Sequence, residues 1–101
     1  MLIGRVLGSV VSTAKDPGLN GHRLQLVEAT DAQGVAAKSG SKRKLFVAVD
    51  GAGAGTDELV LVATGSAARQ GQSTTNKPID ALIVGVIDSV DIQGTDVFRK
   101  S

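Results

Sequence analysis

The chain contains no cysteine, so neither a disulfide framework nor a thiolate metal site is available to it. Aromatic residues are almost as scarce, because tryptophan and tyrosine are missing and Phe46 and Phe98 are the only phenylalanines. Proteins that bind single-stranded nucleic acid stack bases on aromatic side chains, and this chain offers almost no such platform. The formal net charge is +1, from 11 basic and 10 acidic residues, so no strong field attracts polyanions or anionic membranes. We therefore expect neither a nucleic-acid partner nor a membrane partner.

Long apolar segments are also missing. No run approaches the roughly 18 residues of a membrane span, and the start of the chain lacks the basic and apolar regions of a secretory signal. A cytoplasmic protein is therefore expected. The 101 residues suit a single domain spanning 1–101, with a modest core of valine, leucine, isoleucine and alanine. The one basic cluster, Lys42-Arg43-Lys44, is expected to be a solvated loop or strand entry.

No set of residues in the sequence predicts catalysis. A nucleophilic triad needs a histidine base, and His22 is the only histidine, placed between a turn and a strand. The carboxylates Asp57 and Glu58 are neighbours along an extended segment, so their side chains point to opposite faces and do not converge on one substrate. We therefore expect no enzyme activity, no cofactor and no metal. A small hydrolase or lyase that uses His22 remains an alternative, and replacing His22 by alanine would test it.

The pattern of apolar residues predicts an all-β protein built from five strands. The segment 22–30 alternates apolar and polar residues, which places Leu24 and Leu26 on one face of a half-buried strand and Arg23 and Gln25 on the other. Ser66 is expected to cap one short helical turn over 65–70, and the end of the chain is expected to form an extended polar tail that carries Phe98. The five strands are expected at 2–13, 22–30, 44–50, 58–64 and 81–87, with 88–91 continuing the last one and loops at 31–41 and 72–77.

A glycine-rich turn joins the third and fourth expected strands. Gly51, Gly53 and Gly55 alternate with alanine, which allows positive φ angles or a close backbone approach. A phosphate-binding loop is not expected here, because such a loop opens a helix, whereas this turn leads into a strand. We expect Glu58 to accept backbone N–H bonds from the turn, and a pore-facing role remains open.

Two strands of the predicted sheet are apolar on both faces. Segments 59–62 and 81–87 have no polar side, and the sequence contains no long amphipathic helix to cover a second face. Oligomerisation is the favoured explanation, and the alternative is that the strand ends curl and cover both faces within one barrel. Arg69, directly after the helical turn, is expected to bind a carboxylate or a carbonyl at an interface.

Several motifs recur in the same order as in a known family. They are Ile3-Gly4-Arg5-Val6, Val10-Val11-Ser12-Thr13, Leu24 to Val27, Asp50 with Gly53-Ala54-Gly55, Asp57-Glu58, Val60-Leu61, Gly65-Ser66-Ala67-Ala68-Arg69, Pro78-Ile79-Asp80-Ala81 and Ile83-Val84-Gly85-Val86-Ile87-Asp88. Together they resemble the EutN/CcmL family, the pentameric vertex proteins of bacterial microcompartment shells. The likeness covers most of the chain.

The resemblance implies a small five-stranded β-barrel of OB-like topology. It also implies a cyclic pentamer, with the C-terminal tail reaching a neighbour, that closes a cytoplasmic shell of hexameric proteins around metabolic enzymes. An OB-fold nucleic-acid-binding module is the alternative, which the scarcity of aromatic residues disfavours. The residues that we expect at the subunit interface or an axial pore are Gly53, Ala54, Gly55, Glu58, Gly65, Ser66, Arg69 and Phe98.

Overall fold

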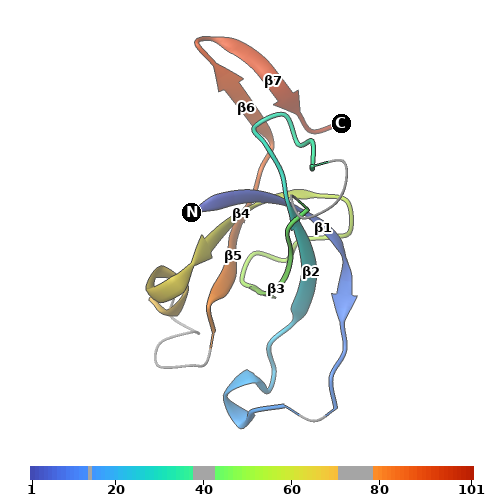
Figure 1. Cartoon of the computed structure of the whole chain (residues 1–101), viewed down its shortest axis with the longest axis vertical. Coiled ribbons are helices and arrows are strands. Elements are labelled where there is room, and N and C mark those ends of the chain that lie inside the picture. Colours follow the sequence, from blue (N-terminus) through green and yellow to red (C-terminus); the bar gives the residue numbers. More distant parts are fainter. Residues whose placement is uncertain (14, 38–42, 71–78) are drawn as a thin grey trace.

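Five strands close into a small barrel, and a two-stranded hairpin stands beyond it (Figure 1). This computed structural model describes residues 1–13, 15–37, 43–70 and 79–101. The barrel order is β1-β2-β3-β5-β4, in which β3 and β5 run parallel and all other neighbours run antiparallel. The predicted all-β class and five-stranded barrel are confirmed. The elements are β1 (Leu2–Val10), η1 (Pro17–Leu19), β2 (Leu24–Ala29), β3 (Leu45–Asp50), β4 (Leu59–Thr64), η3 (Gly65–Arg69), β5 (Ala81–Val86), β6 (Ser89–Ile92) and β7 (Thr95–Arg99).

The strands bend at irregularities that let so small a sheet close. The pairing of β1 with β2 shifts register between Val6 and Gly8, and the pairing of β4 with β5 shifts between Leu61 and Val62. Bulges of this kind increase local twist, which closure requires. Gly4 allows β2 to approach β1 closely, because a Cβ atom there would lie 2.5 Å from Cγ1 of Val27. The glycine interruptions in the sequence therefore mark close approach and curvature.

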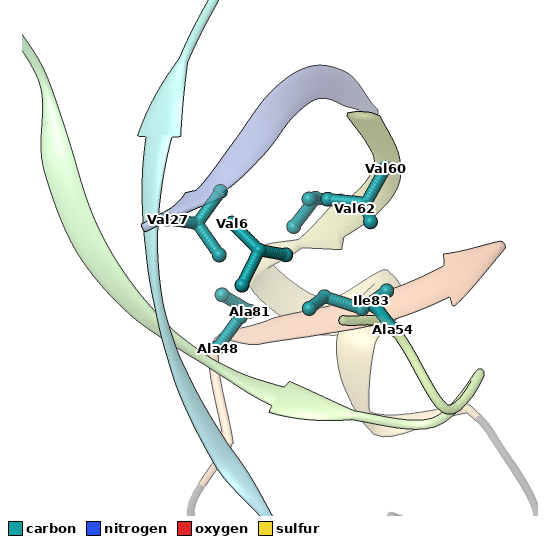
Figure 2. Close-up of a cluster of buried hydrophobic side chains, with 8 residues drawn as sticks. All are labelled: Val6, Val27, Ala48, Ala54, Val60, Val62, Ala81 and Ile83. Carbon is teal, nitrogen blue, oxygen red and sulfur yellow. The ribbon is translucent and has the colours of Figure 1, made fainter. Parts of the chain in front are cut away.

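Aliphatic side chains from all five strands, with Ala54 of the glycine turn, fill the barrel interior (Figure 2). None of these side chains is aromatic, and the half-buried Phe46 packs against the cluster. Because alanine and valine are small, the barrel walls can lie close together and the core stays narrow. The buried members of this cluster are Val6, Val27, Ala48, Ala54, Val60, Val62, Ala81 and Ile83.

A second, smaller cluster lies outside the barrel wall. It joins Val49 and Leu82 to Ala68 of η3 and to Ile79, with Leu19 and Leu24 packed against it. The short helix η3 thus covers part of the outer wall, although its five residues are too few to form a layer. The predicted helical turn is confirmed as a 3-10 helix.

The second apolar face of β4 is covered within the chain itself. Leu59 and Ala63 are 2% and 3% exposed and lie outside the central cluster. The helix η3 directly continues β4, and Leu59 lies near Phe98 of β7. The proposal that β4 needs a partner subunit is therefore wrong for this strand, and the alternative of local coverage is correct.

Exposed apolar surface occurs on the outer wall of β2 and β3, as well as at Val84 of β5, which is 43% exposed. The predicted alternation in β2 is confirmed, but the core takes the face of Gln25 and Val27, so that Leu24 and Leu26 point outward and are only half-buried. Leu26 pairs with Val47, which is 44% exposed, and Leu45 is 45% exposed on the same face. We call Leu24, Leu26, Leu45 and Val47 the outer strip.

The C-terminal residues form a hairpin and not a simple extended tail. Strands β6 and β7 pair with each other, so residues 89–91 do not continue β5 as expected. A turn at Gln93 and Gly94, with φ angles of 51° and 86°, reverses the chain. We call residues 89–99 the arm. It projects away from the barrel beside the loop that follows β2 (Figure 1).

Candidate functional site

The described residues contain no recognisable reaction centre. No group of three or more histidine, cysteine, aspartate or glutamate side chains that could hold a metal ion occurs among them. His22 is half-buried at the end of the turn before β2, where its backbone N–H donates to the carbonyl of Leu19 at 3.1 Å. No helix among the residues that the structure describes has the length and apolar character to cross a bilayer. The features that can carry function are therefore the glycine turn, the base of the arm and the exposed apolar wall.

The carboxylate of Asp50 organises the glycine turn. One oxygen, Oδ1, accepts N–H bonds from Ala52, Gly53 and Ala54 at 3.0, 2.9 and 3.2 Å, and Oδ2 accepts from Ala54 at 2.9 Å. The Asp50 side chain is only 1% exposed. Burial raises the pKa of this carboxyl, but the hydrogen bonds from the turn and from Gln25 outweigh burial and hold the pKa below its usual value. The turn is therefore fixed around one buried charge.

Gln25 ties this turn to the barrel interior. Its amide Nε2 donates to Oδ2 of Asp50 at 3.2 Å and to the carbonyl of Ala54 at 3.0 Å, while its Oε1 accepts from the hydroxyl of Ser9 at 3.4 Å. Gln25 is 1% exposed, and a buried amide of this kind is stable only when it is hydrogen-bonded. Sequence reasoning missed Gln25, because polar residues in a half-buried strand usually face solvent. Its hydrogen bond to Asp50, which lies 25 positions along the chain on the neighbouring strand β3, was not visible from local alternation.

The three glycines of the turn serve different purposes. Gly53 has a φ angle of 74° and open space where a Cβ atom would lie, so only its backbone conformation requires glycine. A Cβ atom on Gly51 would lie 2.9 Å from the carbonyl oxygen of Ile83, which is too close. At Gly55 a Cβ atom would lie 3.4 Å from Oε1 of Glu58. The expected mixture of positive φ and close approach is thus confirmed.

Glu58 connects the glycine turn to the end of the arm. Its Oε1 accepts the N–H of Gly55 at 2.6 Å, as the sequence predicted, and its Oε2 lies 2.5 Å from Nζ of Lys100. Lys100 and the Gly55 N–H hold the pKa of Glu58 below its usual value, and Glu58 in turn raises the pKa of Lys100. The backbone N–H of Lys100 also donates to the carbonyl of Asp88 at 2.7 Å, which closes the base of the arm.

Arg5 and Phe98 hold the arm and the loop after β2 against the barrel. The guanidinium of Arg5 donates to the carbonyls of Asp57 at 2.8 Å and Gly34 at 3.0 Å. A Cβ atom on Gly34 would lie 3.5 Å from both Leu59 Cδ1 and Phe98 Cδ1, so these side chains converge there. Phe98 was expected to dock, and it does so on its own barrel. Whether it also contacts a neighbour stays a prediction.

The helix η3 begins without the side-chain cap that we expected. Ser66 lies inside the helix, the capping position belongs to Thr64, and no side-chain cap bond forms there. The expectation for Ser66 was wrong because Gly65, with a φ angle of 60°, turns the chain one residue earlier. The Gly65 N–H donates to the carbonyl of Asp80 at 2.9 Å. Arg69 donates to the carbonyl of Ile79 in the same chain at 3.2 Å, and its predicted place at an interface stays a prediction.

The basic cluster before β3 is partly neutralised. Arg43 Nε lies 2.6 Å from Oε2 of Glu28, which raises the pKa of Arg43, and Lys42 lies outside the described residues. Phe46 packs against the core, Phe98 lies near Leu59 and Gly34 at the barrel, and both side chains are half-buried in the described chain. This arrangement does not favour the nucleic-acid alternative.

An apolar hollow opens beside the outer strip. It has a volume of about 110 Å³ and is lined by the following residues: Leu19, Leu24, Val47, Ala48, Val49, Ile79 and Ala81. Exposed apolar surface of this kind on the described chain is typical of an interaction site. Sequence reasoning placed such surface on β4 and β5; the barrel covers β4, leaves Val84 of β5 43% exposed, and adds the outer strip on β2 and β3, which the sequence did not predict.

Comparison with known proteins agrees with the fold. The family model described as "Ethanolamine utilisation protein EutN/carboxysome" matches residues 1–88. The chain is 42% identical over 100 residues to the carboxysome shell vertex protein CcmL of Synechocystis sp., covering 99% of this chain and 95% of that protein. A solved structure of a carboxysome subunit, CcmL, superposes with a TM-score of 0.89 at 42% identity, covering 100% of both chains. The pentameric microcompartment shell protein GrpN of Rhodospirillum rubrum superposes with a TM-score of 0.77 at 39% identity, covering 91% of this chain and 99% of that one. The chain belongs to the EutN/CcmL family of microcompartment shell proteins.

Proposed function

We propose that this chain assembles into a cyclic homopentamer that occupies the five-fold vertices of a bacterial microcompartment shell in the cytoplasm. The observation that carries the proposal is the outer strip, in which Leu45 and Val47 are each more than two-fifths exposed. The chain that carries this apolar wall belongs to a family of shell proteins. Exposed aliphatic side chains on a narrow barrel are stabilised when a second subunit covers them. Relatives of this chain are named as shell vertex proteins, and one structural neighbour is named as pentameric.

The role of such a pentamer is geometric. A layer of hexagonal tiles stays flat, and pentamers introduce the curvature that closes it around enclosed enzymes. A ring of five identical copies needs a heterologous interface, in which two different surfaces of the same chain meet. The wall of β2 and β3 and the arm are two such surfaces, and they come from different parts of the sequence (Figure 1). Hexameric shell proteins are the partners that this role requires.

The glycine turn and η3 are our candidates for the remaining contact surface or for the rim of an axial pore. Gly53, Ala54 and Gly55 form a turn that Asp50 fixes from inside, and a rigid turn can keep the same shape in five copies. Glu58 couples this turn to the arm. Gly65, Ser66 and Arg69 hold the short helix, and Phe98 completes the set.

No chemistry is assigned to the chain under this proposal. The described residues contain one histidine without a catalytic partner and no metal-ligand cluster, and we propose neither enzyme activity nor a cofactor. Nucleic acid and membrane are likewise not proposed as partners, since the net charge is +1 and aromatic residues make up 2% of the chain.

Native mass spectrometry at micromolar concentration tests the assembly. We expect a dominant species of five chains, and a stable monomer would refute the proposal. Co-expression with hexameric shell proteins of a microcompartment operon tests the vertex role by electron microscopy. Closed polyhedra should form with the chain, and open or elongated shells should form without it. Equal closure in both cases would contradict the vertex function.

A further inference from the structure

Two side chains in this sequence precede a glycine in the arrangement that lets a side chain react with its own main chain. They are Asn20, before Gly21, and Asp50, before Gly51. In both pairs, attack by the glycine nitrogen on the side-chain carbon Cγ would close a five-membered ring. Glycine hinders this attack least, because it has no Cβ atom. The sequence alone does not distinguish the two pairs, but the fold does.

The barrel protects the pair of Asp50 and Gly51. The Asp50 side chain is 1% exposed, and its carboxylate accepts the N–H bonds of the glycine turn. The N–H of Gly51 donates to the carbonyl of Ile83 on β5 at 3.0 Å. Ring closure would require the carboxylate to leave its donors and the Gly51 nitrogen to give up its bonded proton. This pair can therefore react only when the wall of β3 and β5 has opened.

The pair of Asn20 and Gly21 is open to solvent. Both residues are exposed, and they directly follow η1, which lies at the end of the molecule opposite the arm (Figure 1). Within the part of the chain that the structure describes, neither the Asn20 side chain nor the Gly21 N–H has a hydrogen-bond partner. A Cβ atom on Gly21 would meet no other atom within 4 Å, so the space around this nitrogen is free.

Two hydrogen bonds of the turn restrain this pair. Asn20 has a φ angle of −62° and a ψ angle of 135°. Ring closure requires a rotation about its Cα–C bond that brings Cγ within about 3–3.5 Å of the Gly21 nitrogen. The Asn20 N–H donates to the carbonyl of Pro17, and the His22 N–H donates to that of Leu19, each at 3.1 Å. A surface turn held by so few bonds opens locally at a much lower free energy than a barrel strand.

We propose that Asn20 is a site of spontaneous modification, at which the side-chain amide is converted to aspartate and isoaspartate in the folded protein. The Gly21 nitrogen loses its proton to hydroxide and forms a bond to Cγ of Asn20. The bond from Cγ to the amide nitrogen breaks, and ammonia leaves after taking a proton from water. Water then opens the cyclic imide at either carbonyl. One opening gives aspartate, and the other gives isoaspartate, in which the main chain runs through Cγ.

Isoaspartate would change the path of the chain between two packed side chains. It adds one carbon atom to the main chain, which lengthens it by about 1.5 Å. Leu19 and Leu24 lie on either side of this point, and both pack against the second cluster, around Val49 and Leu82. Because packed side chains leave little spare volume, the longer main chain should displace Leu19 from the cluster. The product also carries a negative charge that asparagine lacks.

Peptide mapping by mass spectrometry tests the modification. The complete chain is incubated in mildly alkaline buffer, folded and, in parallel, unfolded in guanidinium chloride. The rate at Asn20 divided by the rate at Asp50 should be about tenfold or more higher in the folded chain, because only the barrel protects Asp50. Comparison with the unfolded chain cancels the intrinsic difference between the two side chains. An equal ratio in both states, or a folded chain that stays unmodified at Asn20 while the unfolded chain is converted, would overturn the proposal.

An isoaspartate-specific methyltransferase provides an independent label. The folded natural chain should accept methyl groups after incubation. The matched control Asn20→Gln should accept almost none, because glutamine would have to close a six-membered ring, and equal labelling of the two chains would overturn the assignment to Asn20.

The consequence for packing has its own test. Ion exchange enriches the modified chains, because their charge differs, and Asn20→Asp is the control that carries the charge without the additional main-chain carbon. The isoaspartate chain should unfold at a lower denaturant concentration than Asn20→Asp, and equal midpoints would overturn the displacement of Leu19. None of these measurements depends on the ring, so their failure would leave the proposed function in place.

Discussion

At the scale of single residues, two buried polar groups fix the shape of the glycine turn. Asp50 and Gln25 lie at the barrel wall in a chain that is 42% hydrophobic, and each satisfies several backbone or side-chain groups. A carboxylate that accepts N–H bonds from three consecutive residues fixes the path of those residues, because each bond restrains one peptide. The core can be repacked by aliphatic side chains of similar size, but this turn depends on one charge.

The variant Asp50→Ala should lower the free energy of unfolding by about 2–3 kcal/mol, because buried donors lose a charged acceptor. Denaturant unfolding measures this change. The control is Asp80→Ala, since Asp80 is exposed and takes no part in the hydrogen bonds of the glycine turn, and it should stay within about 0.5 kcal/mol of the natural chain. Equal stabilities of the two variants would show that the turn does not depend on Asp50.

Acid should destabilise the chain through the same carboxylate. The pKa of Asp50 is lower in the folded state than the usual carboxyl value, so the unfolded state binds more protons as the pH falls past about 4. The stabilisation is therefore complete above that pH and is lost as the pH approaches the lowered pKa. Thermal unfolding across pH 2–7 should show a shallower loss for Asp50→Asn than for the natural chain. Identical pH profiles would contradict the role of this charge.

At the scale of elements, the glycine turn allows the effect of backbone conformation on stability to be measured separately from the effect of side-chain crowding. Gly53→Val should cost on the order of 1–3 kcal/mol, because φ at this position is 74° while open space surrounds the side-chain position. Gly8→Val is the matched control, since Gly8 also has open space but no positive φ. Unfolding by urea should distinguish them. A Gly53 variant no less stable than the Gly8 variant would remove the argument from backbone strain.

The base of the arm should open locally when its ion pair is removed. Lys100→Ala deletes the contact with Glu58, but the β-barrel and its clusters do not involve Lys100. Hydrogen exchange should therefore rise in residues 88–99 while exchange in β1 to β5 changes little. High salt should have a similar effect on the natural chain, because the pair is partly exposed and screened by ions. Faster exchange throughout the barrel would mean that the arm is part of the cooperative core.

The five barrel strands could be predicted from sequence because their patterns are local. Runs of β-branched residues and turn dipeptides give the existence and order of strands, and the boundaries differ from the structure by at most three residues. The core face of β2 could not be predicted, since Gln25 is buried only because Asp50 and Ala54, far along the chain, supply its partners. The arm was missed for a similar reason. Its strands are short, and their pairing depends on a turn at Gln93 and Gly94 that carries no strong hairpin signal.

Among the candidate site residues, contacts between residues close in the sequence could be predicted, and contacts between distant residues could not. Glu58 was placed correctly because its partner, Gly55, is three residues away. The contact of Lys100 with Glu58 joins residues 42 positions apart, and no local pattern reveals it. The exposed wall was assigned to β4 and β5 because their runs are apolar. The helix η3 and the arm cover β4 near Ala63 and Leu59, whereas Val84 of β5 stays 43% exposed. Coverage depends on three-dimensional neighbours, which a single sequence does not show.

At the scale of the whole molecule, the barrel and the arm have separable roles. The barrel is closed and its interior is filled, so it should fold without the arm. Removing the arm should expose Leu59, which is 2% exposed in the complete chain. The arm adds length in one direction, and the described chain measures 44 × 30 × 24 Å along its principal axes. An elongated subunit with a projecting hairpin can reach a neighbour that a compact barrel alone would not hold.

Deleting the arm therefore tests whether it closes the ring and, through the ring, the shell. A chain ending at Ile87 keeps all five barrel strands, whereas a chain ending at Gly94 would leave β6 without its pairing strand. The shorter chain should retain a β-rich circular dichroism spectrum but lose the five-chain species in native mass spectrometry. Co-expressed with hexameric shell proteins, it should leave elongated or open shells, because incomplete rings cannot occupy a five-fold vertex. If the truncated chain produces closed polyhedra as efficiently as the complete one, the arm is dispensable for closure, and the contacts that hold the ring must lie on the barrel alone.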